Sequence, residues 1–128
     1  NINVRDLPEF WNSKMEEYIG VTPPNDTKGV LQDIHWSMGA IGYFPTYTLG
    51  NLYAAQLYAA ALADDPSIPD KIAKGQFTAL LDWMRSHIHV HGSKLLPADL
   101  MTQATGKAPS SDDFVKYLQS KYTEIYNL

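Results

Sequence analysis

Apolar residues recur at the spacing of an α-helix through most of this chain, and this periodicity limits the fold more than any other feature. The clearest stripe lies between residues 77 and 88 and consists of Phe77, Leu80, Leu81, Met84 and Ile88. These positions fall on one face of a helix, because an α-helix makes a turn every 3.6 residues. A strand-length run of alternating polar and apolar residues occurs nowhere in the sequence. The pattern therefore predicts an all-α fold.

Proline, glycine and capping residues predict where the helices begin and end. One helix is expected to begin after Asp6, which would cap it, and to end at Gly20. Asp26 or Thr27 is expected to cap a short helix that runs to about residue 34, and residues 36–44 are expected to form an irregular connection. We expect about five or six helices in all, over residues 7–19, 45–62, 69–74, 77–91, 97–105 and 112–125.

Composition and charge exclude several classes of protein. Of the 128 residues 45% are hydrophobic and 19% charged, as in a globular protein, and we expect residues 1–128 to form a single helical domain. The net charge of −4 and the lack of a basic run argue against a nucleic-acid partner. No apolar stretch approaches the roughly 18 residues of a membrane span, so we expect no membrane association. Without cysteines or a visible secretion signal, we expect a cytoplasmic location.

A stretch rich in glycine and aromatic residues, over residues 29–50, concentrates the side chains that carry chemistry. It contains His35, with Asp33 two residues before it, and then Tyr43 and Tyr47. Imidazole changes its charge near neutral pH and a phenol donates hydrogen bonds, so the stretch could stabilise a developing oxyanion. Asp33 could hold the tautomer of His35 if the turn brings the two side chains together.

The same residues also have a purely structural interpretation. A turn histidine bonded to Asp33 or to a backbone carbonyl would account for His35 without any chemistry. Tyr43 and Tyr47 are four residues apart, so at the start of a helix they would share a face, as amphipathic core residues do. The pattern of residues leaves both interpretations open.

The eight residues from 29 to 36 read Gly-x-x-Gln-Asp-x-His-Trp. This motif resembles one of the thermostable carboxypeptidases, which are zinc-dependent metallocarboxypeptidases. The positions that match are Gly29, Gln32, Asp33, His35 and Trp36. The resemblance extends from residue 6 to residue 122 and includes the Ile-His-x-His-Gly end of the helix expected over 77–91. It implies a peptide substrate from which single C-terminal residues are hydrolysed, and it allows a homodimeric parent enzyme.

One part of the family pattern is missing from the sequence. The family is similar to other zinc peptidases in carrying a His-Glu-x-x-His motif and a downstream glutamate, which hold the zinc and supply the general base. The four histidines of this chain are His35, His87, His89 and His91, and none is followed by glutamate. The resemblance thus implies the C-terminal part of a larger helical, zincin-like metallopeptidase, whose zinc is bound through residues absent from this chain. We expect the isolated chain to be inactive.

The resemblance also implies roles for individual residues. His35 and Tyr43 would be catalytic residues that donate hydrogen bonds to the oxyanion as its charge develops. Asp33 and Tyr47 would face the substrate. Gln32 would either bind the substrate backbone or its terminal carboxylate, or only satisfy the end of a helix.

His87 and His91 lie one helical turn apart, as two zinc ligands would. Ile88 stands where a zincin has glutamate and no third ligand is evident, whereas histidines at the C-terminal end of a helix are favoured by its dipole. We therefore expect both to be structural.

A second class of function stays open. The chain could be a non-catalytic helical binding or scaffolding domain. A His-Glu-x-x-His motif upstream in the gene would favour the enzyme over this alternative.

Overall fold

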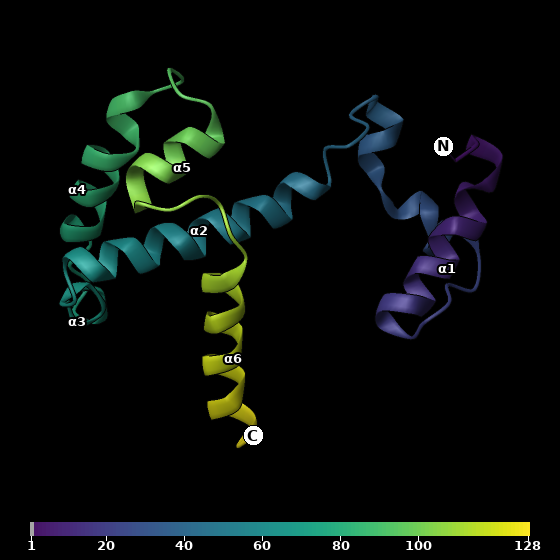
Figure 1. The fold of residues 1–128 in the computed structure, drawn as a ribbon. Helices are drawn as coiled ribbons and strands as arrows, with labels where there is room; N and C mark the ends of the chain where they lie inside the picture. The colour runs from purple at the N-terminus through teal and green to yellow at the C-terminus, as the bar shows by residue number, and fades with distance from the viewer. Residues whose placement is uncertain (1) are drawn as a thin grey trace. The chain divides into compact units, whose positions relative to one another are not determined.

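The structure is a computed structural model that describes residues 2–128, and it divides into two compact units. The first unit ends at Thr46 and the second spans Tyr47–Leu128. Within residues 2–128 there are six α-helices and five short 3-10 helices but no strand, which confirms the all-α prediction (Figure 1). Each unit is described by itself, and the expectation of one domain over residues 1–128 stays a prediction.

The first unit is built around helix α1, Leu7–Ile19, as the sequence predicts. A short 3-10 helix, η1 (Val4–Asp6), leads directly into it. Asp6 occupies the N-cap position, as predicted, but its side chain forms no capping hydrogen bond. Gly20 ends α1 with a φ of +74°, a left-handed conformation that glycine adopts without strain.

The connection after α1 consists of tight 3-10 turns rather than the helical stretch expected to about residue 34. The turns are η2 (Asp26–Lys28), η3 (Val30–Gln32) and η4 (Ile34–Met38). Asn25, not Asp26 or Thr27, caps η2, because its side chain accepts a hydrogen bond from the Lys28 amide.

The backbone at Gly29 explains why these turns do not join into one helix. Gly29 has φ −115° and ψ −118°, far from helical values. A Cβ at Gly29 would lie 3.2 Å from the Cβ of Pro23, so this close approach favours glycine. The interruption depends on packing against Pro23, which helix periodicity does not reveal.

The second unit is a set of helices around the long helix α2, Pro45–Asp64, whose first two residues belong to the first unit. After it come α3 (Ile68–Ala73), α4 (Thr78–His87), η5 (His89–His91), α5 (Pro97–Thr105) and α6 (Asp112–Tyr126). The core of the unit forms where Ala61, Ile68 and Trp83 are buried together. The predicted helix over residues 77–91 ends earlier, at His87, with Ile88 as its C-cap, and the chain continues as η5.

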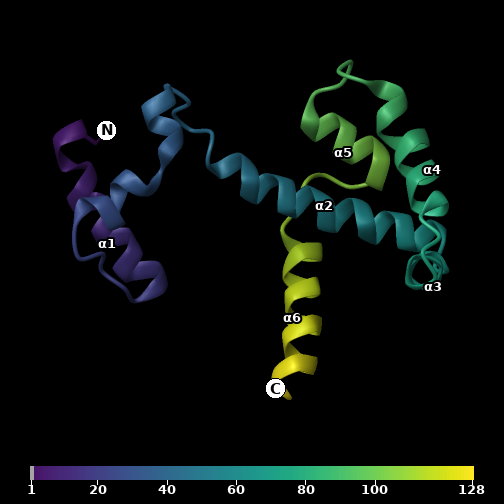
Figure 2. The same cartoon turned by 180° about the vertical axis from the view of Figure 1, so that it is seen from behind.

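A buried glutamine joins α2 to the connection between α5 and α6. The side chain of Gln56 is fully buried, and its Nε2 donates to Thr105 Oγ1 and to the carbonyl oxygens of Lys107 and Ala108. Its Oε1 accepts from the Ser110 amide at 3.1 Å. The connection therefore crosses α2 at a fixed point, with α5 and α6 on opposite sides of α2 (Figures 1 and 2).

No helix within residues 2–128 is long and apolar enough to cross a membrane.

Candidate active site

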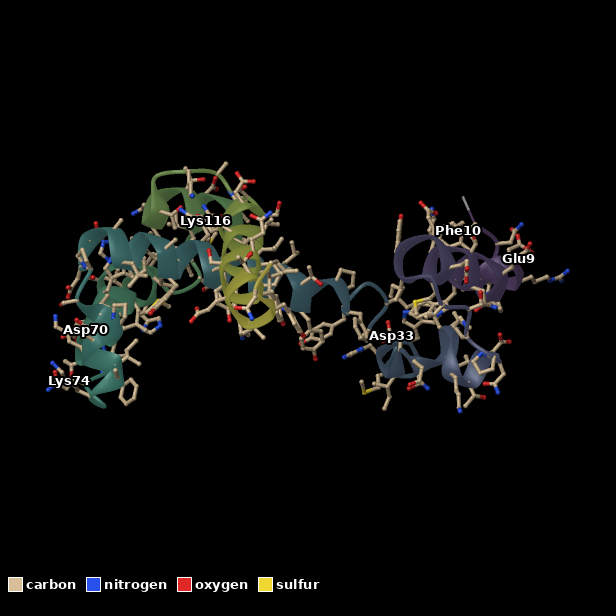
Figure 3. The ribbon with its side chains drawn as sticks, turned by 90° about the horizontal axis from the view of Figure 1, so that it is seen from below. Glu9, Phe10, Asp33, Asp70, Lys74 and Lys116 are labelled. Atoms are coloured by element: carbon tan, nitrogen blue, oxygen red, sulfur yellow. The ribbon has the colours of Figure 1, made fainter. Side chains whose placement is uncertain are left out.

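A buried carboxylate and an imidazole form the centre of the candidate site. Asp33 stands at the N-cap of η4, where its Oδ1 accepts a 3.0 Å hydrogen bond from the His35 amide. The same oxygen lies 2.7 Å from Nδ1 of the His35 ring. The Asp33 side chain is 7% exposed and that of His35 is 15% exposed. The spacing of two residues thus brings the two side chains together, as the sequence allowed. Figure 3 labels Asp33 in its place within the connection.

Two aromatic rings hold the His35 imidazole from other directions. The ring of Tyr43 lies 4.9 Å from it between centroids, tilted by 35°. The ring of Phe44 approaches edge-on at 5.5 Å. With Asp33 fixing one nitrogen and two rings fixing the plane, the imidazole is held in one orientation.

Local backbone geometry explains why Tyr43 reaches His35. The turn η4 ends at Gly39, whose φ of +74° reverses the chain, and the Ala40 amide then donates to the His35 carbonyl at 2.9 Å. The Tyr43 amide donates in turn to the Ala40 carbonyl. Two successive turns therefore fold the segment back, so that its aromatic residues lie over the imidazole.

Gln32 and Tyr47 are the other two residues of the predicted site. Nε2 of Gln32 donates to the backbone carbonyl of Thr27, a bond that fits the alternative in which Gln32 satisfies a local backbone group. Tyr43 lies two residues before the start of α2, whereas Tyr47 is in its first turn and belongs to the second unit. The substrate-facing roles of Gln32, Asp33 and Tyr47 stay predictions.

Phe44 is the residue of this cluster that sequence reasoning missed. It stands between Tyr43 and Pro45 in an aromatic run. The sequence favours Tyr43 as the site residue, because its phenol can donate a hydrogen bond and a phenyl ring cannot. The sequence signal for Phe44 is that it directly follows Tyr43. Two consecutive aromatic residues at the end of an irregular connection can both face the same partner.

The histidines at the end of α4 have structural partners. The His87 ring stacks on that of Trp83 with centroids 4.3 Å apart, and its Nδ1 lies 2.9 Å from the Trp83 carbonyl oxygen. Asp64, at the end of α2, accepts from Nε1 of Trp83 at 2.7 Å and lies 4.0 Å from Nε2 of His87. His91 Nε2 lies 3.3 Å from the amide nitrogen of Gln103. These contacts account for His87 and His91 through packing.

The described residues do not form a set of ligands for a metal ion. Among residues 2–128, no three side chains of His, Cys, Asp or Glu are grouped so that they could hold a metal ion. The Asp33–His35 pair offers only two side chains, and Oδ1 of its carboxylate already bonds to the ring and the backbone amide of His35. The cluster has the chemistry of a proton-bearing imidazole beside a phenol, which is suited to donating hydrogen bonds.

The sequence model of the carboxypeptidase Taq (M32) metallopeptidases matches residues 1–122. The chain belongs to this family.

Individual relatives agree with this membership. Thermostable carboxypeptidase 1 of Thermus thermophilus is 46% identical over 125 residues, which are 98% of this chain and 24% of that protein. Carboxypeptidase 1 of Bacillus subtilis is 40% identical over 127 residues, 99% of this chain and 25% of that protein. The chain thus spans about a quarter of the length of these relatives.

Solved structures show the same helical arrangement. The crystal structure of an M32 carboxypeptidase from Deinococcus radiodurans R1 superposes with a TM-score of 0.91 at 40% identity, covering 99% of this chain and 26% of that one. Metallocarboxypeptidase 1 of Trypanosoma cruzi gives a TM-score of 0.87 at 38% identity, covering 95% of this chain and 26% of that one. The all-α fold is therefore that of a segment of M32 carboxypeptidases.

Proposed function

We propose that this chain is the C-terminal part of a zinc-dependent metallocarboxypeptidase that hydrolyses single C-terminal residues from peptides. Membership of the M32 metallopeptidases supports the class of reaction and the need for a metal. The names of the Thermus and Bacillus relatives support a carboxypeptidase. Zinc would be bound by parts of the enzyme outside this chain, since the described residues offer no set of ligands.

His35 and Tyr43 would supply hydrogen bonds to the oxyanion of the tetrahedral intermediate. The observation that carries this proposal is the contact of the two rings, 4.9 Å between centroids, with the imidazole held by Asp33. Donors fixed before the reaction stabilise the developing charge without reorganising, and one such donor contributes about 3 kcal/mol to transition-state stabilisation. Tyr43 is 48% exposed, so its ring stands at the edge of the cluster.

The proposal extends to the substrate contacts, the location and the partners of the whole enzyme. Gln32 and Tyr47 would face the peptide substrate, and the whole enzyme would be a cytoplasmic homodimer without nucleic-acid or membrane partners. The net charge of −4 supports the absence of a nucleic-acid partner. The competing function, a non-catalytic binding or scaffolding domain, would need His35 and Tyr43 only for packing.

A comparison of three histidines tests the proposed function. In the whole enzyme we expect His35→Ala to lower kcat by about 100-fold or more, because an oxyanion donor is lost. His87→Ala and His91→Ala are the matched controls and should leave kcat nearly unchanged, since their partners are Trp83 and Gln103. Circular dichroism must show that each variant is folded, because the loss of a partly buried histidine can also unfold a protein. A folded His35→Ala enzyme with full activity, beside an inactive His91→Ala enzyme, would contradict the proposal.

A further inference from the structure

We propose that Asp33 is a positioning residue that fixes the protonation pattern of His35, rather than a contact of the substrate. This inference rests on the proposed function of His35. It concerns how the chain prepares the imidazole, and it assigns Asp33 a role other than the substrate-facing one expected from the family resemblance.

The first argument is the geometry of one oxygen. Oδ1 of Asp33 accepts from both the backbone amide and the ring of the same residue, at 3.0 Å and 2.7 Å. The two bonds hold the side chain of His35 relative to its own backbone. A 180° flip of the ring would put Cδ2 where Nδ1 lies and break the shorter bond, so the flip is disfavoured.

The second argument is burial. The Asp33 side chain is 7% exposed, and a buried carboxylate is costly unless it is paired and hydrogen-bonded. Its pairing with His35 meets that need inside the protein. Oδ1 is already engaged by the amide and the ring of His35, so a substrate that bonded to this oxygen would compete with both bonds.

The third argument is chemical. An ionised carboxylate only accepts hydrogen bonds, so the nitrogen that faces it, Nδ1 of His35, must carry a proton. This excludes the neutral tautomer that is protonated at Nε2 alone. The imidazole can then donate from Nε2 only as the doubly protonated imidazolium, and the Asp33 carboxylate compensates the charge of that form. The pair therefore provides a hydrogen-bond donor at Nε2 of His35, and the Asp33 carboxylate balances the positive charge of the ring.

Substitution of Asp33 separates this role from its alternatives. Asp33→Ser keeps a side-chain oxygen that can cap η4, because serine is as good an N-cap as aspartate, but it removes the carboxylate from the ring. In the whole enzyme we expect kcat to fall at least 10-fold while KM changes less than about twofold, because only the transition state uses the donor. Asp33→Asn retains an amide oxygen at the same reach, and we expect it to recover part of the loss. The matched control is Asp26→Ser, which changes an exposed aspartate of the same unit and should leave both constants unchanged.

A spectroscopic measurement keeps the proposal testable if Asp33→Ser does not fold. Nitrogen-15 NMR of histidine-labelled whole enzyme should show a protonated Nδ1 at His35 in the unmodified protein. A neutral His35 protonated only at Nε2 would overturn the proposal. So would an Asp33→Ser enzyme with a raised KM and unchanged kcat, because that result would make Asp33 a substrate contact. Neither outcome alters the expected loss of activity in His35→Ala, which tests the oxyanion role separately.

Discussion

Tyr43 contributes to the candidate site through two features that substitution can separate, its ring and its hydroxyl. Tyr43→Phe keeps the ring that lies 4.9 Å from the His35 imidazole and removes the phenol. We expect kcat of the whole enzyme to fall by about 100-fold with little change in KM, because the proposed hydrogen bond from the hydroxyl forms to the transition state. Steady-state kinetics of Tyr43→Phe beside Tyr18→Phe, which alters an exposed tyrosine of α1, provides the measurement. A kcat within about twofold of the unmodified enzyme would assign Tyr43 to packing.

At the scale of a single residue, the Asp65 carboxyl has a pKa well below its ordinary value. Hydrogen bonds from Lys71 and Ser67 lower the pKa of its carboxyl from 3.8 to about 2. Because the pKa is lower in the folded state, the stabilisation is complete above pH 3.8 and is lost as the pH falls towards 2. Carbon-13 NMR titration of the carboxyl should give this value, and Lys71→Met should raise it.

The matched control for Lys71→Met is Lys74→Met, which alters an exposed lysine three residues further along the same segment, labelled in Figure 3. It should leave the Asp65 titration where it is. An Asp65 carboxyl that titrates near 3.8 in the unmodified protein would show that the pair with Lys71 does not form in solution.

At the scale of elements, the position of a helix end could be predicted where one residue determines it. Gly20 and Gly106 end α1 and α5 in left-handed conformations, and Pro45 begins α2, each as the sequence indicates. The turns η2 and η3 could not be predicted, because the backbone at Gly29 depends on its approach to Pro23. Periodicity carries no information about such contacts.

In the candidate site, too, a contact between residues close in sequence could be predicted, whereas contacts made by the folded backbone could not. The spacing of Asp33 and His35 made a hydrogen bond possible, and the structure shows it. The edge-on contact of Phe44 depends on the two successive turns between His35 and Tyr43, so the adjacency of Phe44 to Tyr43 could suggest this contact but could not establish it. The partner of Gln32, the Thr27 carbonyl, is equally a product of the folded turn.

Gln56 provides a test of the second unit at the scale of elements. Gln56→Leu would leave the half-buried Ser110 amide and the carbonyls of Lys107 and Ala108 without their side-chain partner, at a cost of about 1–2 kcal/mol. We expect trypsin to cleave after Lys107, within this connection, faster in the variant than in the unmodified enzyme. Gln119→Leu makes the same change at an exposed position of α6 and should not alter the rate. Equal cleavage rates in the two variants would show that Gln56 does not hold the connection.

At the scale of the whole molecule, the chain exposes surfaces that are typical of an interior. Apolar residues surround α2, as in a buried helix, yet only Gln56 and Ala61 of its 20 residues are buried. A groove of about 650 Å³ lies between α2 and α6, lined by Ala55, Ala59 and Phe114 among others. The relatives are about four times as long, and we expect the rest of such an enzyme to cover these surfaces.

The central claim is that this chain provides hydrogen-bond donors to the active site of the whole enzyme, whereas the metal ligands lie in the rest of the enzyme. The most direct measurement is the zinc content of the folded 128-residue chain after dialysis against a weak chelator, with peptidase activity measured on the same sample. Circular dichroism must first show the expected helices. We expect no stoichiometric zinc and no release of C-terminal residues from a peptide, because the ligands lie elsewhere. One zinc ion retained per chain, together with release of C-terminal residues, would contradict the claim.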